Sequence, residues 1–249
     1  HIGRGTLDLT NIKAVVLDEA DEMLDLGFAD ELDAIFDALP GHVQTALFSA
    51  TLPPKIRELA KTILRNPAEV NIAISKPNEA IEQGAYICYE GQKLGIVREM
   101  FSWPSESKTI IFSSSKQKVK ELAHTLKRMK LDVAPMHSDL DQEKREQVML
   151  DFKNNKVRIL VATDIVARGI DIEDIGMVIN YDVPHDPEDY IHRIGRTGRA
   201  RKHGVAYTLL SDFPSRMRLD DIARNTRSQI IPAVLGEDGQ VTPAENKSK

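Results

Sequence analysis

The sequence of 249 residues has little cysteine and no long apolar run. Cys88 is the only cysteine, so the chain has no internal disulfide and no thiolate-rich metal site, which fits a reducing compartment such as the cytoplasm. No apolar run reaches the roughly 18 to 20 residues of a membrane span, and no signal segment opens the chain. With 41% hydrophobic and 29% charged residues, the composition predicts a soluble globular protein and excludes a disordered or fibrous one.

The acidic and basic residues are unevenly distributed along the chain. Residues 1–82 hold 7 basic against 14 acidic residues, residues 83–212 hold 20 against 19, and residues 213–249 hold 6 against 5. This asymmetry suggests two domains with different roles. Because the chain opens on His1 within a polar stretch, we interpret it as part of a longer protein.

Short apolar runs alternate with helical patterns throughout the chain. In the first third, the expected strands are Ala14–Leu17, Thr45–Phe48 and Val70–Ile74, with helices at Phe28–Leu39 and Pro53–Leu64. After a polar linker at 75–82, six further strands are expected at Ala85–Tyr89, Thr109–Phe112, Val133–Met136, Ile159–Ala162, Met177–Tyr181 and Val205–Leu210, with helices near 92–102, 116–129 and 141–153. The alternation predicts a doubly wound α/β fold with parallel sheets.

The domain boundaries follow from the same pattern. We expect a first domain at residues 1–74, the linker at 75–82, a second domain at 83–212 and a tail at 213–249 whose last dozen residues are disordered. The first domain has only three expected strands, so it is predicted to be an incomplete unit, whereas the second has six and is predicted to be complete.

Polar clusters follow five of the expected strands. They are Asp18-Glu19, Ser49-Ala50-Thr51, Ser113-Ser114-Ser115, His137-Ser138-Asp139 and Thr163-Asp164. In open α/β sheets, ligands bind at the carboxyl ends of the strands, so five clusters at this edge predict a ligand-binding face.

The acidic cluster Asp18-Glu19-Ala20-Asp21 follows an apolar strand, as in the Walker B arrangement, where one carboxylate holds Mg²⁺ and its neighbour orients water. The alternative is a helix N-terminus, where acidic residues are favoured by the helix dipole.

Residues 191–199 read IHRIGRTGR, with three arginines and two glycines. Such a segment is not expected in a core. Its glycines would let the backbone approach a ligand, and its arginines suit bidentate contacts to phosphate. The alternative is a solvated basic turn.

In order and spacing, these stretches resemble the DEAD-box ATP-dependent RNA helicases of superfamily 2. The matching segments are residues 16–24 (VLDEADEML), 49–51 (SAT), 110–113 (IIFS), 142–145 (QEKR), 162–171 (ATDIVARGID) and 192–199 (HRIGRTGR). The resemblance covers about residues 3–212 and implies two RecA-like domains, the first of them incomplete.

The resemblance also implies roles in binding and hydrolysing ATP with Mg²⁺. Asp18 would hold Mg²⁺ through water and Glu19 would polarise the attacking water. Arg196 and Arg199 resemble arginine fingers that stabilise the transferring phosphate, and Gly169 and Asp171 match positions that contact the nucleotide. A further set, Asp21, Ser49, Thr51 and His192, would couple the nucleotide site to the RNA-clamping conformation.

RNA is the implied partner, mainly through its sugar-phosphate backbone. The matching RNA-binding positions are Ser113, Ser114, Arg145, Thr163 and Arg168. A departure from the family pattern is Ser138, which stands where the family usually has glycine. The implied activity is RNA unwinding or remodelling, driven by ATP hydrolysis between the two domains.

The phosphate-loop motif of the family is absent, as are its adenine-reading glutamine motif and its first RNA-binding motifs. The chain contains no G-x-x-x-x-G-K-[ST] phosphate loop, so the chain by itself is expected to be inactive. A second interpretation is a truncated helicase module that binds RNA or a protein partner without turnover. Retention of Asp18 and Glu19 weighs against a degenerate site, and the sequence upstream of His1 would discriminate the two.

Overall fold

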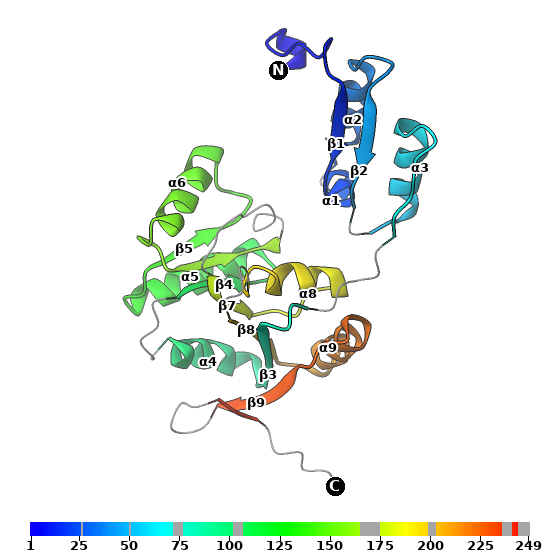
Figure 1. Ribbon diagram of the computed structural model, residues 1–249. Helices are drawn as coiled ribbons and strands as arrows, with labels where there is room; N and C mark the ends of the chain where they lie inside the picture. Colours follow the sequence, from blue (N-terminus) through cyan, green and yellow to red (C-terminus); the bar gives the residue numbers. More distant parts are fainter. Residues whose placement is uncertain are drawn as a thin grey trace. The chain divides into compact units, whose positions relative to one another are not determined.

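The chain folds into two compact units, residues 1–72 and 73–249. The computed structural model describes residues 1–25, 27–49, 51–71, 77–101, 107–164, 175–198, 203–235 and 241–243. Figure 1 shows the ribbon, and each unit is described by itself. No helix within these ranges is long and apolar enough to cross a membrane.

The first unit is built around a two-stranded parallel sheet. After the short η1 (Ile2–Arg4), its elements are β1 (Ala14–Leu17), α1 (Ala20–Asp25), α2 (Ala29–Asp37), β2 (Gln44–Leu47) and α3 (Pro54–Ile63). Strand β1 pairs with β2 from Ala14 opposite Gln44 to Leu17 opposite Leu47. The core is small and contains the buried side chains of Leu17, Ala20, Leu32 and Ile56.

The third strand expected in this unit is not found in its described part. Val70 and Asn71 have no strand structure, and residues 72–74 of the expected strand lie outside the described residues. The side chain of Val70 is 83% exposed, so the start of this apolar run buries nothing against the sheet. The prediction was wrong there because an apolar run becomes a strand only when a neighbouring strand pairs with it.

The second unit contains one large sheet. Its strands are β3 (Ile81–Ile87), β4 (Lys108–Phe112), β5 (Val133–Met136), β6 (Ile159–Ala162), β7 (Ile175–Asn180), β8 (Gly204–Leu210), β9 (Ile231–Leu235) and β10 (Val241–Pro243). Their order is β10-β9-β3-β8-β7-β4-β6-β5, and all neighbouring pairs are parallel except β9 with β10. The expected parallel α/β fold is confirmed.

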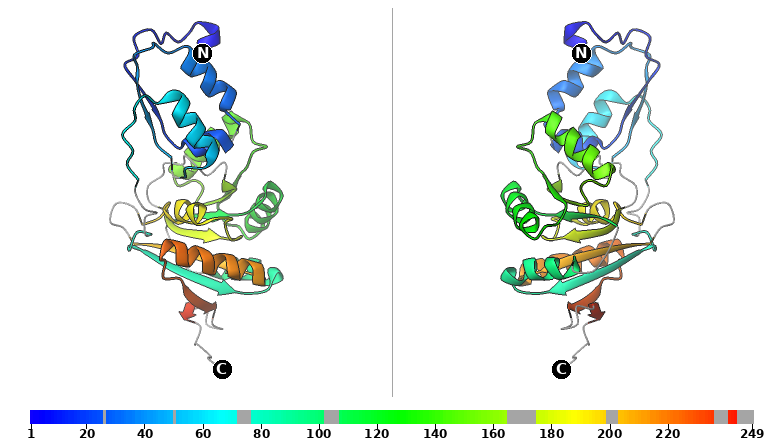
Figure 2. Two further views of the ribbon diagram at one scale, coloured as in Figure 1. Left: turned by 90° about the vertical axis from the view of Figure 1, so that its right-hand side faces the viewer. Right: turned by 90° about the vertical axis from the view of Figure 1, so that its left-hand side faces the viewer.

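Helices cover both faces of this sheet, as Figures 1 and 2 show. They are α4 (Lys93–Met100), α5 (Lys116–Arg128), α6 (Gln142–Lys153), α8 (Pro187–Ile194) and α9 (Phe213–Thr226). Successive strand residues point to opposite faces, so Ile110 packs on the side of α6, α8 and α9, whereas Ile111 packs on the side of α4 and α5. Burial on both faces explains why the strands are continuously apolar.

The second unit extends beyond both ends of the domain expected at residues 83–212. Strand β3 begins at Ile81, inside the expected linker, and the expected tail contains α9, β9 and β10. Strand β9 pairs with β3 from Gly84 opposite Ile231 to Tyr86 opposite Ala233. Pro232 lies within β9 but outside the stretch 233–235 that pairs with β10, and proline is tolerated at such edge positions. The last residues, 244–249, lie outside the described residues.

Candidate functional site

In the first unit, the candidate acidic site lies between β1 and α1. Asp18 and Glu19 follow β1 directly, and both are exposed. The backbone N–H of Glu19 donates to Asp18 Oδ1 at 3.0 Å, and Glu19 has a φ of 53°. A non-glycine residue in this left-handed region costs about 1 kcal/mol or more, so the strand-to-helix turn at Glu19 is strained. The turn holds two adjacent carboxylates in solvent at the strand tip.

Asp21 joins this acidic loop to the segment after β2. Thr51 donates to Asp21 Oδ2 from its backbone N–H at 2.9 Å and from its hydroxyl at 2.8 Å. The backbone N–H of Asp21 donates to Ser49 Oγ at 3.3 Å, and Ser49 Oγ donates to the Thr51 carbonyl at 2.7 Å. Burial acts to raise the pKa of Asp21, but the hydrogen bonds from Thr51 outweigh it and the pKa is lowered. The structure therefore brings Asp21, Ser49 and Thr51 together.

The residues of the first unit suit Mg²⁺ that is carried by a nucleotide. Exposed carboxylate oxygens at Asp18 and Glu19 are the hard ligands that Mg²⁺ prefers. Within the described ranges, no group of three or more His, Cys, Asp or Glu side chains gathers to hold a metal ion. Because Mg²⁺ commonly binds through one or two carboxylates together with substrate phosphates and water, the pair fits this mode.

In the second unit, the candidate site lies at the carboxyl ends of β7, β4, β6 and β5, which are neighbours in that order. The polar segments that follow these strands therefore lie side by side along one edge. We define the serine loop as Ser113–Ser115, after β4, and the arginine segment as residues 191–199, of which 191–198 are described.

The serine loop is attached to Asp182, which follows β7. Ser113 Oγ donates to Asp182 Oδ2 at 2.9 Å, and the Ser114 backbone N–H donates to the same oxygen at 2.8 Å. Lys118 Nζ lies 2.9 Å and Lys93 Nζ 3.4 Å from Asp182 Oδ1. Burial acts to raise the pKa of Asp182, but these hydrogen bonds outweigh it and hold the pKa well below its ordinary range.

The serine loop differs in one respect from the expectation for RNA binding. Ser113 is fully buried, so its hydroxyl serves Asp182 and does not face solvent, whereas Ser114 is exposed. Ser115 caps α5, because its side chain accepts from the Lys118 N–H at 3.3 Å.

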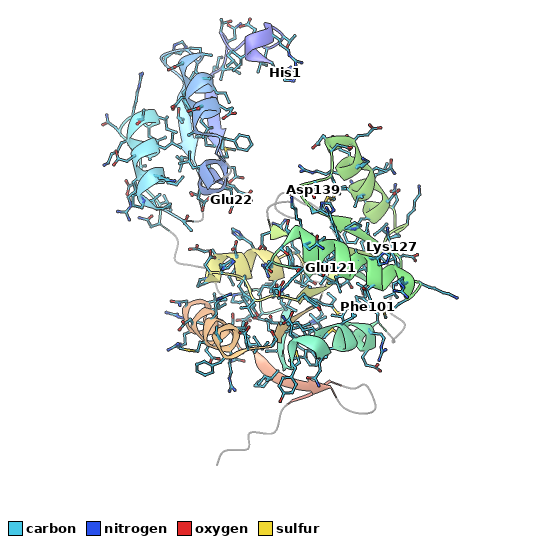
Figure 3. The ribbon with its side chains drawn as sticks, turned by 180° about the vertical axis from the view of Figure 1, so that it is seen from behind. His1, Glu22, Phe101, Glu121, Lys127 and Asp139 are labelled. Carbon is cyan, nitrogen blue, oxygen red and sulfur yellow. The ribbon has the colours of Figure 1, made fainter. Side chains whose placement is uncertain are left out.

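The loop after β5 contains a second cluster of charges. Asp139, labelled in Figure 3, accepts from Lys116 Nζ at 2.8 Å and from Lys120 Nζ at 2.6 Å, both on α5, and these contacts lower the pKa of Asp139 to about 2. His137 is buried, which lowers its pKa, and its Nδ1 accepts from the Asp139 N–H at 3.3 Å. Arg145, half-buried on α6, donates to the Ser138 carbonyl at 3.1 Å.

Arg193 lies at the carboxyl edge of the sheet, and the sequence did not reveal that its side chain is buried. It is only 3% exposed, although the arginine segment was not expected in the core. Its Nε and Nη2 donate to the two carboxylate oxygens of Asp164 at 2.5 and 2.7 Å, and its Nη1 donates to the Asp182 carbonyl at 2.7 Å and to Asn180 Oδ1 at 3.2 Å. The expectation fails because a buried guanidinium is tolerated when its charge is paired and its N–H groups are bonded.

The glycines of the arginine segment serve the packing of the unit itself. Gly198 has a φ of +67°, and a Cβ there would lie 2.5 Å from Ile81 Cγ1. The Gly198 carbonyl also accepts from Asn78 Nδ2 at 2.6 Å. Gly198 thus forms an internal turn that only glycine fits.

Of the other two arginines of this segment, Arg196 lies within the described residues. Arg196 is half-buried and its Nε donates to the His192 carbonyl at 3.2 Å. Several expected site residues lie outside the described residues, namely Arg168, Gly169, Asp171 and Arg199. Thr163 is described, half-buried, and directly precedes the Asp164 that pairs with Arg193.

Parallel sheets that gather carboxylates and cations at the carboxyl ends of their strands are typical of nucleotide-binding α/β proteins. Two family models match the chain: DEAD/DEAH box helicase at residues 1–59 and helicase conserved C-terminal domain at residues 92–201. The chain belongs to the DEAD-box helicase family.

Individual relatives agree with this assignment. The chain is 41% identical over 253 residues to the ATP-dependent RNA helicase CshA of Limosilactobacillus reuteri, covering 99% of this chain and 50% of the relative. It is 43% identical over 214 residues to the DEAD-box ATP-dependent RNA helicase CshA of Geobacillus kaustophilus, covering 85% and 45%. The chain thus spans about half the length of the curated relatives it matches.

Solved structures of the family are also similar. S. cerevisiae Dbp5 bound to RNA and ADP BeF3 has a TM-score of 0.84 and 34% identity, covering 93% of this chain and 62% of that chain. The C-terminal domain of the DEAD-box protein Dbp5 has a TM-score of 0.58 and 34% identity, covering 62% of this chain and 91% of that one.

Proposed function

We propose that this chain works within an ATP-dependent RNA helicase that unwinds or remodels RNA duplexes by coupling ATP hydrolysis to RNA binding. The proposal is based on two features that occur together in one chain of this family. Exposed carboxylates stand at the tip of β1, and a row of polar segments follows β7, β4, β6 and β5 in the second unit. We further propose that both units contribute to binding ATP and RNA, and that hydrolysis of ATP to ADP and phosphate releases the RNA.

Asp18, Glu19 and the arginine segment would act on the nucleotide. Bound MgATP supplies the phosphoanhydride bond whose hydrolysis drives the cycle. Asp18 would hold Mg²⁺ through water, and Glu19, the neighbouring exposed carboxylate, would orient the attacking water. Arg196 and Arg199 would stabilise the charge that develops on the transferring phosphate, and Gly169 and Asp171 would contact the nucleotide.

RNA would contact the carboxyl edge of the second unit. Exposed Ser114, half-buried Thr163 and Arg145, and Arg168 would meet the sugar-phosphate backbone, which makes binding largely independent of sequence. Ser113 would contribute through its bond to Asp182, since its hydroxyl is buried. A cytoplasmic location is proposed with this function, because the single Cys88 is free.

The experiment that tests the proposal compares ATP hydrolysis by the full-length protein and by this chain, each with and without RNA. We expect RNA-stimulated hydrolysis by the full-length protein. For the chain alone we expect background only, because its sequence has no Gly-rich phosphate loop. Hydrolysis by the chain at about 1 per second or faster would contradict the second expectation. RNA binding by the full-length protein without any hydrolysis would instead favour a non-enzymatic RNA-binding or protein-binding module.

A further inference from the structure

Asp182 lies at the centre of a partly buried network of charges at the carboxyl edge of the second unit. Three carboxylates and three cations take part, each from a different element or loop: Asp164, Asp182, Glu90, Lys93, Lys118 and Arg193. Lys93 and Arg193 are each 3% exposed at their side chains, and Asp182 is 13% exposed. Opposite charges balance within the network, so it can remain buried at modest cost.

The side chain and the backbone of Asp182 hold two different segments. Its carboxylate accepts from Ser113 Oγ and from the Ser114 N–H, which anchors the serine loop. Its backbone carbonyl accepts from Arg193 Nη1 at 2.7 Å, which anchors α8. A shift of the serine loop therefore acts on α8 through a single residue, with charge-assisted hydrogen bonds at both ends.

Arg193 also donates hydrogen bonds to Asp164, a residue that follows β6. Its bidentate contact to Asp164 ties α8 to the end of β6, directly after Thr163. Arg193 follows His192 in α8 and precedes Arg196 by three residues. Both candidate RNA segments are thus connected to the Arg193 guanidinium, the serine loop through Asp182 and Thr163 through the adjacent Asp164.

We propose that Asp182 is a positioning residue that couples RNA binding at the serine loop to the placement of the arginine segment. The inference rests on the proposed function and adds to it a route, lying wholly within the second unit, by which RNA stimulates ATP hydrolysis. The network suits this role because Lys93, Asp182 and Arg193 are largely buried, and Asp182 is hydrogen-bonded both to the serine loop and to Arg193 of the arginine segment.

The test is the RNA stimulation of ATP hydrolysis in the full-length protein, measured as the ratio of the rate at saturating RNA to the rate without RNA. We expect Asp182→Asn, which keeps the shape but removes the charge, to lower this ratio by about tenfold, within the usual range of coupling between two sites. The unstimulated rate and the apparent affinity for ATP should stay within about twofold, because no residue that would touch the nucleotide is changed.

The matched control is Asp212→Asn, which also removes one carboxylate from the second unit. Asp212 caps α9 by accepting from the Ser215 N–H at 2.7 Å, and asparagine caps equally well, so its ratio should equal that of the wild type. If Asp182→Asn fails to fold, Ser113→Ala provides the test, because it removes one hydrogen bond to Asp182 and should lower the ratio several-fold.

Three outcomes would count against the inference. Equal losses of the stimulated and unstimulated rates in Asp182→Asn, which leave the ratio unchanged, would show a role in stability alone. Stimulated and unstimulated rates both at the wild-type level in a folded variant would overturn the coupling outright. A wild-type protein that hydrolyses ATP without any response to RNA would refute the proposed function itself, and the inference would fall with it.

Discussion

At the scale of single residues, burial of charge is the feature that organises the second unit. Arg193 stacks over the ring of Phe112, with 5.1 Å between its guanidinium carbon and the ring centroid, while its N–H groups are bonded to Asp164, Asn180 and Asp182. Lysine has no planar fork that could reproduce these contacts. Arg193→Lys is therefore a disruptive change despite its unaltered charge.

The low pKa of Asp182 predicts that acid destabilises the second unit. A carboxyl group whose pKa is lowered on folding adds stability above its unfolded pKa of about 3.9 and loses it as the pH falls through the folded value. In urea denaturation from pH 7 down to pH 2, the wild type should lose stability below about pH 4. Asp182→Asn should be less stable at pH 7 and show a flatter pH profile. Parallel pH profiles of stability for the wild type and Asp182→Asn would refute the assignment of this pH dependence to Asp182.

Arg199 allows a test of catalysis at a single side chain. In the full-length protein, Arg199→Ala should lower the maximal ATPase rate at saturating RNA by about 10³ to 10⁵-fold, as for arginine fingers in other phosphoryl-transfer enzymes, with ATP affinity changed only a few-fold. Arg199→Lys should rescue poorly. A raised RNA requirement with an unchanged maximal rate would assign Arg199 to RNA binding instead.

At the scale of secondary-structure elements, the turn after α8 depends on one glycine. Gly198→Ala places a methyl group against Ile81 in a backbone conformation that alanine disfavours, and should lower the free energy of unfolding by about 1 to 3 kcal/mol. The matched control is Gly95→Ala within α4, where nothing lies within 4 Å of the new Cβ. This control should raise stability by about 0.5 to 1 kcal/mol, because alanine favours helix.

Urea denaturation of both glycine variants gives the comparison, with the midpoint and slope read together. Opposite signs for the two substitutions would support the assignment of Gly198 to an internal turn. Equal effects would show that the turn is less constrained than its φ of +67° indicates.

At the scale of the whole molecule, the two units differ in how well they bury their sheets. The first has two strands in its described residues, and Val16 in β1 and Phe48 directly after β2 are 61% and 57% exposed. The second has helices on both faces and two large buried clusters. Stability follows buried apolar area, so the second unit should be much more stable.

Limited proteolysis of the chain tests this difference. We expect a resistant fragment that contains β3 to β8 together with α9, and rapid loss of the first unit. Because β9 pairs with β3, cleavage should fall after β9 more readily than between α9 and β9. Survival of the first unit with cleavage of the second would show that the assignment of stability is wrong.

The sequence by itself determined the periodic elements and the family. Strands β5 and β6 were predicted at their observed limits, and α5 and α6 to within one residue, because continuous apolar runs and helical spacing report burial directly. The six motifs from 16–24 to 192–199 together suggested the family, since order and spacing of chemical groups are properties of the chain alone.

Only the tertiary structure decided which of these charged and polar groups face inward. Burial of Ser113 and Arg193 depends on Asp182 and Asp164, which lie far from them in sequence and come close only when parallel strands align. Strand β9 likewise exists because β3 offers an edge to pair with. The residues next to a side chain in sequence do not show which residue it will contact across the sheet. Hydrogen-bond pairing and burial of charge are therefore known only from the folded structure.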